Sequence, residues 1–247
     1  ENHWAKEYVE DVVKLGFMDG YSDGTFRPNE KVNRLEALTM ACKLMRYQGD
    51  DLKAARVEKN DFVNGFTMLS EGEKDILSYG IVKGIVNEKF VSDNYFKDGI
   101  VTDAEKLEVS IYIARAMGLE EEAKKRGSVL LYKDAELIPI EARPYVDLLI
   151  QKGVLNSAGD SEGKFNPRQT VTRATTAKML SVANAGIDPK GTDVVEPVEN
   201  PTLLKDNEFL GSIVAKAGDF IIVESVEKKD SYKIVKDTIV TVDGEKA

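Results

Sequence analysis

The sequence predicts a mainly α fold made of three helix–loop–helix repeats, followed by a short β-rich C-terminal segment. The prediction starts from a four-residue pattern that occurs twice at one constant offset, without insertion. Its members are Phe26, Pro28, Val32 and Arg34 in one copy and Phe165, Pro167, Val171 and Arg173 in the other. Self-similarity held in register indicates repeated structural units. Such arrays favour an extended binding surface over a single catalytic pocket.

A third, eroded copy lies between these two. The segment from Gly80 to Gly84 resembles Gly16 to Gly20, and 96–105 resembles 26–36 with one residue deleted and the proline lost. In this alignment Asp103 stands in the arginine position, where its charge suits a helix N-terminus. The alignment defines repeats 1, 2 and 3 over residues 1–46, 60–118 and 132–185, with charged, partly helical connectors at 47–60 and 119–131.

Each repeat is expected to form a helix, a turn-rich loop and a second helix. In repeat 1, valines recur at helical spacing before Gly16, which ends the first helix. The second helix begins after Asn33, with Glu36 three residues later in capping-box spacing. Thr102 with Glu105 is expected to repeat this cap, and Thr172 keeps its first half. Apolar stripes on the three second helices predict a central bundle.

From residue 186 the composition changes. Residues 186–202 contain three prolines and predict an extended linker before a β-rich segment, 203–247. Runs rich in Val, Ile and Tyr predict strands at Ser212–Lys216, Phe220–Val226 and Tyr232–Val242. Because two or three strands alone are marginally stable, we expect this segment to begin a further domain rather than to pack on the repeats.

Composition excludes several classes of function. The net charge of −9 argues against nucleic acid or an anionic membrane as the main partner. No apolar run approaches the roughly 20 residues that span a bilayer. Cys42 is the only cysteine, so no internal disulfide forms, and the redox compartment stays open. The only histidine is His3, and no catalytic triad, metal cluster or phosphate loop is present, so neither catalysis nor a cofactor is predicted.

The two arginines indicate an anion site. Arg34 and Arg173 each follow a helix cap, where a cation opposes the helix dipole but free backbone N–H groups favour an anion. A guanidinium at that place suits bidentate binding of a carboxylate or phosphate. The alternative is that each arginine forms a salt bridge with an aspartate of a neighbouring repeat and joins the repeats together.

The repeated pattern resembles the S-layer homology motif of bacterial surface proteins, over residues 1 to about 185. The residues that carry the resemblance are His3-Trp4-Ala5, Gly20-Tyr21-Ser22-Asp23-Gly24-Thr25-Phe26-Arg27-Pro28 and Val32-Asn33-Arg34-Leu35-Glu36 in repeat 1, and Tyr132-Lys133-Asp134 and Val171-Thr172-Arg173-Ala174 in repeat 3. In repeat 3 the loop is two residues longer and departs from the motif, which leaves its contacts open.

The resemblance implies a pseudo-threefold trimer of repeats within one chain, with a central helical bundle and grooves between adjacent repeats. In the family these grooves bind secondary cell-wall polysaccharide, typically bearing a pyruvate ketal, and anchor the protein non-covalently. The chain is therefore expected to be secreted and held in the cell wall or S-layer. Its expected partners are an anionic wall polysaccharide and neighbouring S-layer subunits, without a nucleic acid or a membrane span.

By resemblance, the signature arginine is the main contact to the sugar and its pyruvate. The expected glycan-binding residues are Arg34, Arg173, Trp4, Gly20, Tyr21, Asp23, Thr25 and Thr172. Trp4 either stacks on a sugar ring or anchors the core between repeats, and Gly20 either lines a groove or serves turn geometry. Asp103 predicts a weak or lost groove in repeat 2.

Two other functions compete with this one. The repeats could be the wall tether of an enzyme or scaffold whose functional domain lies beyond residue 247. They could also form a protein-interaction scaffold in which the arginines are purely structural. A calcium loop from Asp19 to Glu30 is set aside because Tyr21 occupies a ligand position and Pro28 interrupts the loop.

Overall fold

The computed structural model describes residues 3–187 and, after them, the strand residues 212–217, 220–224, 229–233, 241–242 and 245–246. The chain divides into a helical unit, Glu1–Asp193, and a C-terminal unit, Val194–Ala247, which are described separately. The described residues are mainly helical, which confirms the predicted fold class. None of their helices has the length and apolar character needed to span a membrane.

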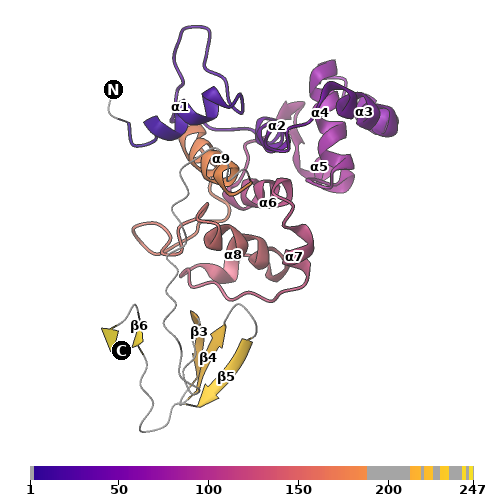
Figure 1. Ribbon diagram of the computed structural model, residues 1–247. Helices are drawn as coiled ribbons and strands as arrows, with labels where there is room; N and C mark the ends of the chain where they lie inside the picture. The colour runs from indigo at the N-terminus through magenta and orange to yellow at the C-terminus, as the bar shows by residue number, and fades with distance from the viewer. Residues whose placement is uncertain are drawn as a thin grey trace. The chain divides into compact units, whose positions relative to one another are not determined.

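Three helices, one from each repeat, form the centre of the helical unit (Figure 1). They are α2 (Arg34–Leu44), α6 (Lys106–Ala116) and α9 (Arg173–Ile187), and each contacts the other two. An outer helix of each repeat packs on the central helix of another repeat. The pairs are α1 (Lys6–Lys14) on α9, α4 (Glu71–Val82) on α2, and α8 (Arg143–Gln151) on α6. This cyclic exchange is the pseudo-threefold arrangement that the resemblance implied.

The remaining elements of the helical unit connect these pairs. They are α3 (Gly49–Asn64), α5 (Glu88–Asn94), β1 (Phe96–Lys97), β2 (Ile100–Val101), α7 (Glu120–Lys124) and the 3-10 turns η1 (Ala135–Leu137) and η2 (Ile140–Ala142). Helix α7 lies within the predicted connector 119–131, and α3 begins within the predicted connector 47–60 but continues to Asn64. Helix α3 packs along α4.

A ring of backbone hydrogen bonds sets the register of the three repeats. Val32 N donates to Val171 O at 3.1 Å, Val171 N to Ala104 O at 3.1 Å, and Ala104 N to Val32 O at 2.9 Å. Val32, Ala104 and Val171 are therefore equivalent positions. Two residues further on, the equivalent positions are the first residues of α2, α6 and α9, which are Arg34, Lys106 and Arg173.

This register corrects the predicted alignment of repeat 2. Lys106, and not Asp103, occupies the arginine position, and Asp103 instead pairs with Lys31 of repeat 1 at 2.8 Å. The capping box of α6 joins Glu105 to Glu108, so the predicted cap at Thr102 and Glu105 is wrong. The alignment failed because a β-hairpin, β1–β2, lengthens this segment where a deletion had been assumed.

The hairpin turns at Asp98 and Gly99, whose φ angles are 53° and 77°. Asp-Gly is a favoured dipeptide for such a two-residue turn. The glycine alignment in repeat 2 is also wrong. Gly84, with φ 71°, ends α4 in the way that Gly16, with φ 73°, ends α1. Gly80 has another role, since a Cβ there would lie 2.7 Å from Cδ1 of the buried Leu38, where α4 packs closely on α2.

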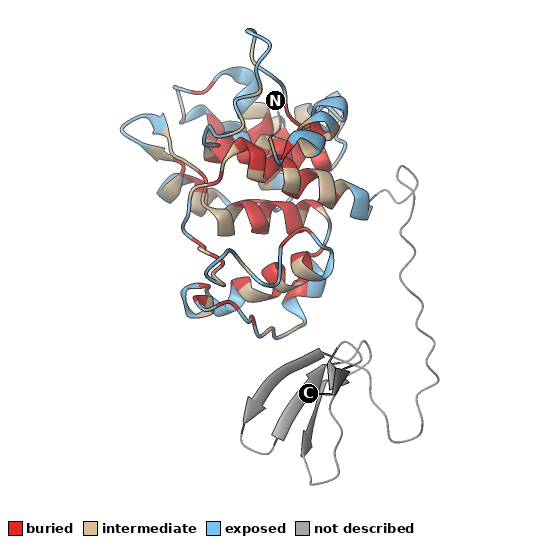
Figure 2. Ribbon diagram, turned by 90° about the vertical axis from the view of Figure 1, so that its left-hand side faces the viewer, coloured by how far each residue is buried: buried red, intermediate tan, exposed pale blue. Residues whose placement is uncertain are grey.

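The core follows the central helices, where buried residues concentrate (Figure 2). Leu38, Ile113 and Leu180 of these helices are at most 1% exposed. Local signals placed the helix starts correctly in repeats 1 and 3. Asn33 forms the predicted capping box with Glu36.

The described part of the C-terminal unit consists of short antiparallel strands. β3 (Ser212–Ala217), β4 (Phe220–Glu224) and β5 (Lys229–Lys233) form one sheet, and β6 (Thr241–Val242) pairs with β7 (Glu245–Lys246). Strands at β3 and β4 were predicted. The strand predicted at Tyr232–Val242 overlaps β5 at residues 232–233 and β6 at residues 241–242, and residues 234–240 between them lie outside the described residues. The linker predicted at 186–202 lies outside the described residues from 188 onward.

Candidate functional site

The first residue of each central helix reaches into the loop of the next repeat, which defines three junctions. In the 1–2 junction Arg34 donates hydrogen bonds to Asn94, Thr102 and Glu108. In the 2–3 junction Lys106 donates to Phe165. In the 3–1 junction Arg173 donates to Asp19 and Phe26. The junctions share one geometry but differ in the groups that face each cation.

The 3–1 junction holds a buried arginine between neutral acceptors. Arg173 Nε donates to Phe26 O at 2.9 Å and Nη2 to Asp19 O at 2.6 Å. Its Cζ lies 4.4 Å from the centre of the Phe26 ring and 5.0 Å from that of Tyr21. The residue is 8% exposed, and no acidic side chain in the described part of the chain pairs with it. The guanidinium of Arg173 therefore has carbonyl acceptors and no direct carboxylate partner among the described residues.

The backbone at the start of α9 is already hydrogen-bonded. Arg173 N donates to Glu30 O at 2.8 Å and Ala174 N to Pro28 O at 2.9 Å. Thr175 N donates to Thr172 Oγ1 at 3.3 Å, so the Thr172 hydroxyl caps the helix. The expectation of free N–H groups at this helix end is thus wrong. Any anion here must be bound by the guanidinium rather than by the helix terminus.

The repeat 1 loop folds around its own polar groups. Asp23 accepts hydrogen bonds from Thr25 Oγ1 at 2.6 Å, Thr25 N at 2.9 Å and Arg27 Nη2 at 3.0 Å. These bonds hold the pKa of the Asp23 carboxyl far below its ordinary value. Gly24, with φ 79°, completes the turn. The polar groups of Asp23 and Thr25 therefore shape the loop that contacts Arg173.

Glu30, the second carboxylate beside this loop, also has partners within the chain. Tyr21 Oη donates to Glu30 Oε2 at 2.6 Å, and Arg27 Nη1 lies 3.4 Å from Glu30 Oε1. The hydrogen bond with Glu30 raises the pKa of Tyr21 and lowers the pKa of Glu30. Arg27 also lies over the Tyr21 ring, with Cζ 3.9 Å from its centre. Tyr21 is thus an aromatic surface bordered by two guanidinium groups.

The 1–2 junction contains a closed ion pair. Arg34 Nη2 donates to Glu108 Oε1 at 2.7 Å and Nε to Oε2 at 3.0 Å, while Nη1 donates to Asn94 O at 3.0 Å and to Thr102 Oγ1. Burial acts to lower the pKa of Arg34, but the hydrogen bond and charge of Glu108 outweigh it, and the pKa is raised. This arrangement matches the alternative in which an arginine joins two repeats, with a glutamate in place of the expected aspartate.

The 2–3 junction has lysine as its cation, which the sequence reading missed. Lys106 Nζ donates to Phe165 O at 2.8 Å and lies 4.6 Å from the centre of the Phe165 ring. Burial lowers the pKa of this lysine. The loop opposite is fixed by Asp134, which accepts from Phe165 N and Asn166 N at 2.7 Å each. The Asp-Gly hairpin signal before Lys106 could have revealed the correct register.

The predicted site residues fall into two groups. Gly20, Tyr21, Asp23 and Thr25 belong to the repeat 1 loop and join Arg173 and Thr172 around the 3–1 junction, whereas Arg34 lies in the 1–2 junction. Trp4 is 61% exposed, and its ring neighbour is His3, so the alternative role as a core anchor is wrong. At Gly20 a Cβ would lie 3.3 Å from Thr25 O, which explains a small residue there.

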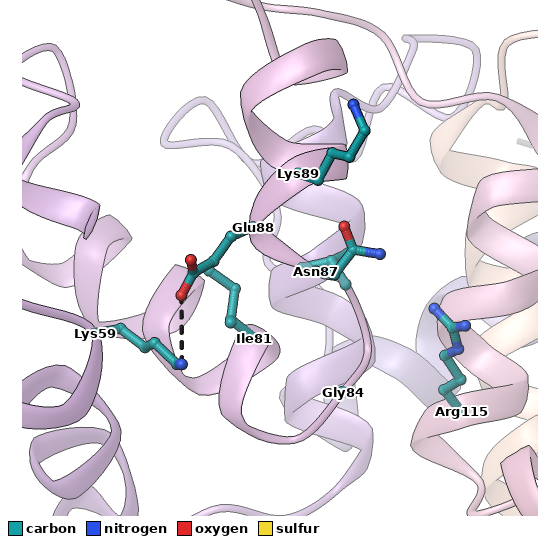
Figure 3. Close-up of a pocket in the computed structure, with 8 residues that line it drawn as sticks. Lys59, Ile81, Gly84, Asn87, Glu88, Lys89 and Arg115 are labelled. Atoms are coloured by element: carbon teal, nitrogen blue, oxygen red, sulfur yellow. Dashed lines mark ion pairs between the residues drawn. The ribbon is translucent and has the colours of Figure 1, made fainter.

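A pocket of about 660 Å³ lies apart from these junctions, between α3, α5 and α6 (Figure 3). In Figure 3 Lys59 points toward Glu88, and the two form an ion pair at 3.3 Å. Arg115 pairs with Glu120 at 2.8 Å. Asn87 uses its side-chain oxygen to cap α5. Since the polar groups of this pocket have partners in the chain, the predicted site remains at the junctions.

Comparison with known proteins bears on the same repeats. The family model described as the S-layer homology domain matches residues 1–38 and 131–177, which fall in repeats 1 and 3. The chain carries S-layer homology domains. These two domains supply the loop and the arginine of the 3–1 junction.

Relatives agree with this assignment. The chain is 23% identical to the surface-layer 125 kDa protein of Lysinibacillus sphaericus over 81% of its own length and 16% of the relative. It is 23% identical to an S-layer protein of Bacillus licheniformis, over 74% of the chain and 19% of the relative. The cellulosome-anchoring protein of Acetivibrio thermocellus is 42% identical over 16% of the chain and 9% of the relative. These similarities place the chain at the bacterial cell surface, in the cell wall or S-layer.

Proposed function

We propose that this chain anchors a surface protein to the bacterial cell wall by binding an anionic wall polysaccharide at the 3–1 junction. The ligand group is a carboxylate such as that of a pyruvate ketal, and the chain performs no chemistry on it. The chain spans about a fifth or less of the length of the S-layer relatives it matches. The proposal therefore concerns wall binding by this chain alone.

The observation that supports this proposal is the positive charge of Arg173. The guanidinium is held by two carbonyl oxygens and has no carboxylate partner in the described residues. A buried cation without an anion is costly, and an external carboxylate would compensate it. The charge-assisted bonds to such a ligand are worth about 1.5–3 kcal/mol each. The guanidinium of Arg173 is the local charge that would attract the anion to this acidic chain.

The surroundings of Arg173 suit a sugar. The Tyr21 ring lies beside both guanidinium groups and offers a flat apolar face next to the charge. Gly20 has no side chain, and a Cβ there would lie 3.3 Å from Thr25 O. Trp4 is exposed enough to stack on a further sugar unit. In this proposal Thr172, Asp23 and Thr25 keep the site in shape rather than contact the glycan through their side-chain oxygens.

Sedimentation with purified walls of the producing bacterium tests the proposal. Walls should bring down the folded protein, and walls stripped of polysaccharide or of pyruvate should not. Arg173→Ala should weaken binding by at least about 10-fold, the loss of one charge-assisted bond. Lys53→Ala is the matched control, because it removes an exposed cation of α3 outside the junctions. Undiminished binding by folded Arg173→Ala would rule out this site.

A tether for a surface enzyme or scaffold uses the same binding site and differs only in what the tether carries. The name of the cellulosome-anchoring relative fits such a tether, and the names of the S-layer relatives fit a lattice protein. The full coding sequence separates the two. A protein-interaction scaffold with purely structural arginines agrees with Arg34 but leaves the charge of Arg173 unexplained.

A further inference from the structure

We propose that Glu108 closes the 1–2 junction by placing its own carboxylate where an external carboxylate would bind Arg34. The inference rests on the function proposed for the 3–1 junction, whose arginine occupies the equivalent position. It makes Glu108 the residue that determines whether the 1–2 junction can take an external carboxylate.

The geometry is that of a bound carboxylate ligand. Glu108 receives Arg34 Nη2 at 2.7 Å on Oε1 and Nε at 3.0 Å on Oε2, in the side-by-side manner of bidentate recognition. Its Oε2 also accepts from Glu105 N at 2.9 Å, the capping-box bond of α6. The two side chains are 10% and 13% exposed. Since all three guanidinium nitrogens are in use, Arg34 has no donor pair left for a ligand.

The equivalent positions in the other repeats behave differently. Each lies two residues after the junction cation, and they are Glu36 in repeat 1, Glu108 in repeat 2 and Thr175 in repeat 3. Glu36 keeps the capping bond to Asn33 N at 2.9 Å but forms no ion pair with Arg173. Thr175 has no charge. Among the three, Glu108 alone combines the cap with a contact to the neighbouring cation.

The loops explain this difference. In the 3–1 junction, carbonyl oxygens of Phe26 and Asp19 occupy Nε and Nη2 of Arg173. In repeat 2 the corresponding loop is replaced by α5 and the β1–β2 hairpin, and its backbone offers the guanidinium of Arg34 one acceptor, Asn94 O. The Nε and Nη2 atoms of Arg34 then donate to the Glu108 carboxylate. Loss of the sugar-facing loop and neutralisation of its arginine therefore occur together in the same repeat.

The closure is tested by measuring ligand binding at the 1–2 junction of a full chain whose 3–1 site has been removed. The probe is a methyl hexoside that carries a pyruvate ketal, with its neutral methyl ester as the control, measured by calorimetric titration of the full chain. In an Arg173→Gln background the 3–1 site is removed. Adding Glu108→Gln keeps the capping oxygen and removes the charge, and we expect probe affinity to rise at least 10-fold. Adding Arg34→Gln should abolish that gain.

Control variants separate closure from damage to the fold. Glu108→Thr copies repeat 3 and should open the same site. Glu73→Gln makes the same change in the capping box of α4 and should open none. Thermal melting confirms that each variant is folded. If both folded Glu108 variants fail to gain Arg34-dependent binding, closure is wrong. Arg34-dependent binding with Glu108 intact would overturn it equally.

The outcome is distinguishable from failure of the proposed function. If the unmodified chain does not bind the probe, the assignment of the 3–1 junction fails. A gain of binding in Glu108→Gln that needs Arg34 would still support closure of the 1–2 junction. If the unmodified chain binds one probe and neither Glu108 variant binds a second, the proposed function stands and closure fails.

Discussion

Arg34 and Arg173 hold equivalent positions in two junctions of one molecule, yet they have different partners. Arg34 is bound by the Glu108 carboxylate, whereas Arg173 is bound by carbonyl oxygens and keeps its charge. Both are 8% exposed, so burial does not distinguish them. The comparison shows that the same signature arginine can join two repeats or face a ligand. The group supplied by the next repeat decides which.

The largest expected effect is on stability at the 1–2 junction. Arg34→Ala leaves the Glu108 carboxylate buried without its cation, which should lower the free energy of unfolding by about 3–5 kcal/mol. Arg173→Ala removes bonds to neutral carbonyls and should cost about 1–3 kcal/mol. Urea unfolding of both variants checks the difference. Equal losses would mean that the two arginines have the same structural role.

A double-mutant cycle sharpens the same contrast. The coupling energy between Arg34 and Glu108 should be about 2–3 kcal/mol, because they share a buried, bidentate ion pair. The equivalent cycle between Arg173 and Glu36 should give less than about 0.5 kcal/mol, since no ion pair joins them. Denaturant unfolding of the single and double variants measures both. Strong coupling in the second cycle would contradict the assignment of an uncompensated Arg173.

A smaller effect is expected in the repeat 1 loop. Gly24 has φ 79°, a conformation that costs other residues about 1–2 kcal/mol, so Gly24→Ala should destabilise by about that amount and weaken wall binding. Gly72→Ala is the opposite control, because Gly72 lies in α4 with open space around its Cα and alanine favours helices. If Gly24→Ala destabilises the protein but leaves wall binding unchanged, this loop is not part of the binding site.

The smallest effect concerns pH at the 3–1 junction. The hydrogen bond from Tyr21 holds the folded-state pKa of Glu30 below its unfolded value of about 4.3. The stabilisation is therefore fully present above about pH 4.3 and is lost as the pH falls through the folded-state pKa. Carbon NMR titration should give a Glu30 midpoint below about 4.3, and Tyr21→Phe should raise it. An unchanged midpoint in Tyr21→Phe would refute this contact.

Local signals made much of the fold predictable. The capping box of Asn33 and Glu36 and the terminal glycine Gly16 act within a few residues, so the sequence placed the end of α1 and the start of α2 correctly. The repeated pattern predicted three units and their central helices. It also brought Tyr21, Asp23 and Thr25 together, because they share one short loop with Gly24 at its turn.

Repeat 2 was not predictable in the same way. Its motif is eroded, and the alignment assumed a deletion where the hairpin at Asp98 and Gly99 adds length. The register is set by bonds from Ala104 to Val32 and from Val171 to Ala104, which join residues far apart in the sequence. Lys106 was missed as the junction cation for this reason. Such pairings arise only when the three repeats pack together.

The sequence by itself determined the helical class, the repeated units, the caps of α2 and α9 and the arginines at the ends of the loops. These features depend on local propensity and on spacing along one segment. The tertiary structure decided what each arginine meets, because its partners come from another repeat. Glu108 lies 74 residues from Arg34, and Asp19 lies 154 residues from Arg173. The charge left at the 3–1 junction is therefore a property of the packed repeats and not of the motif.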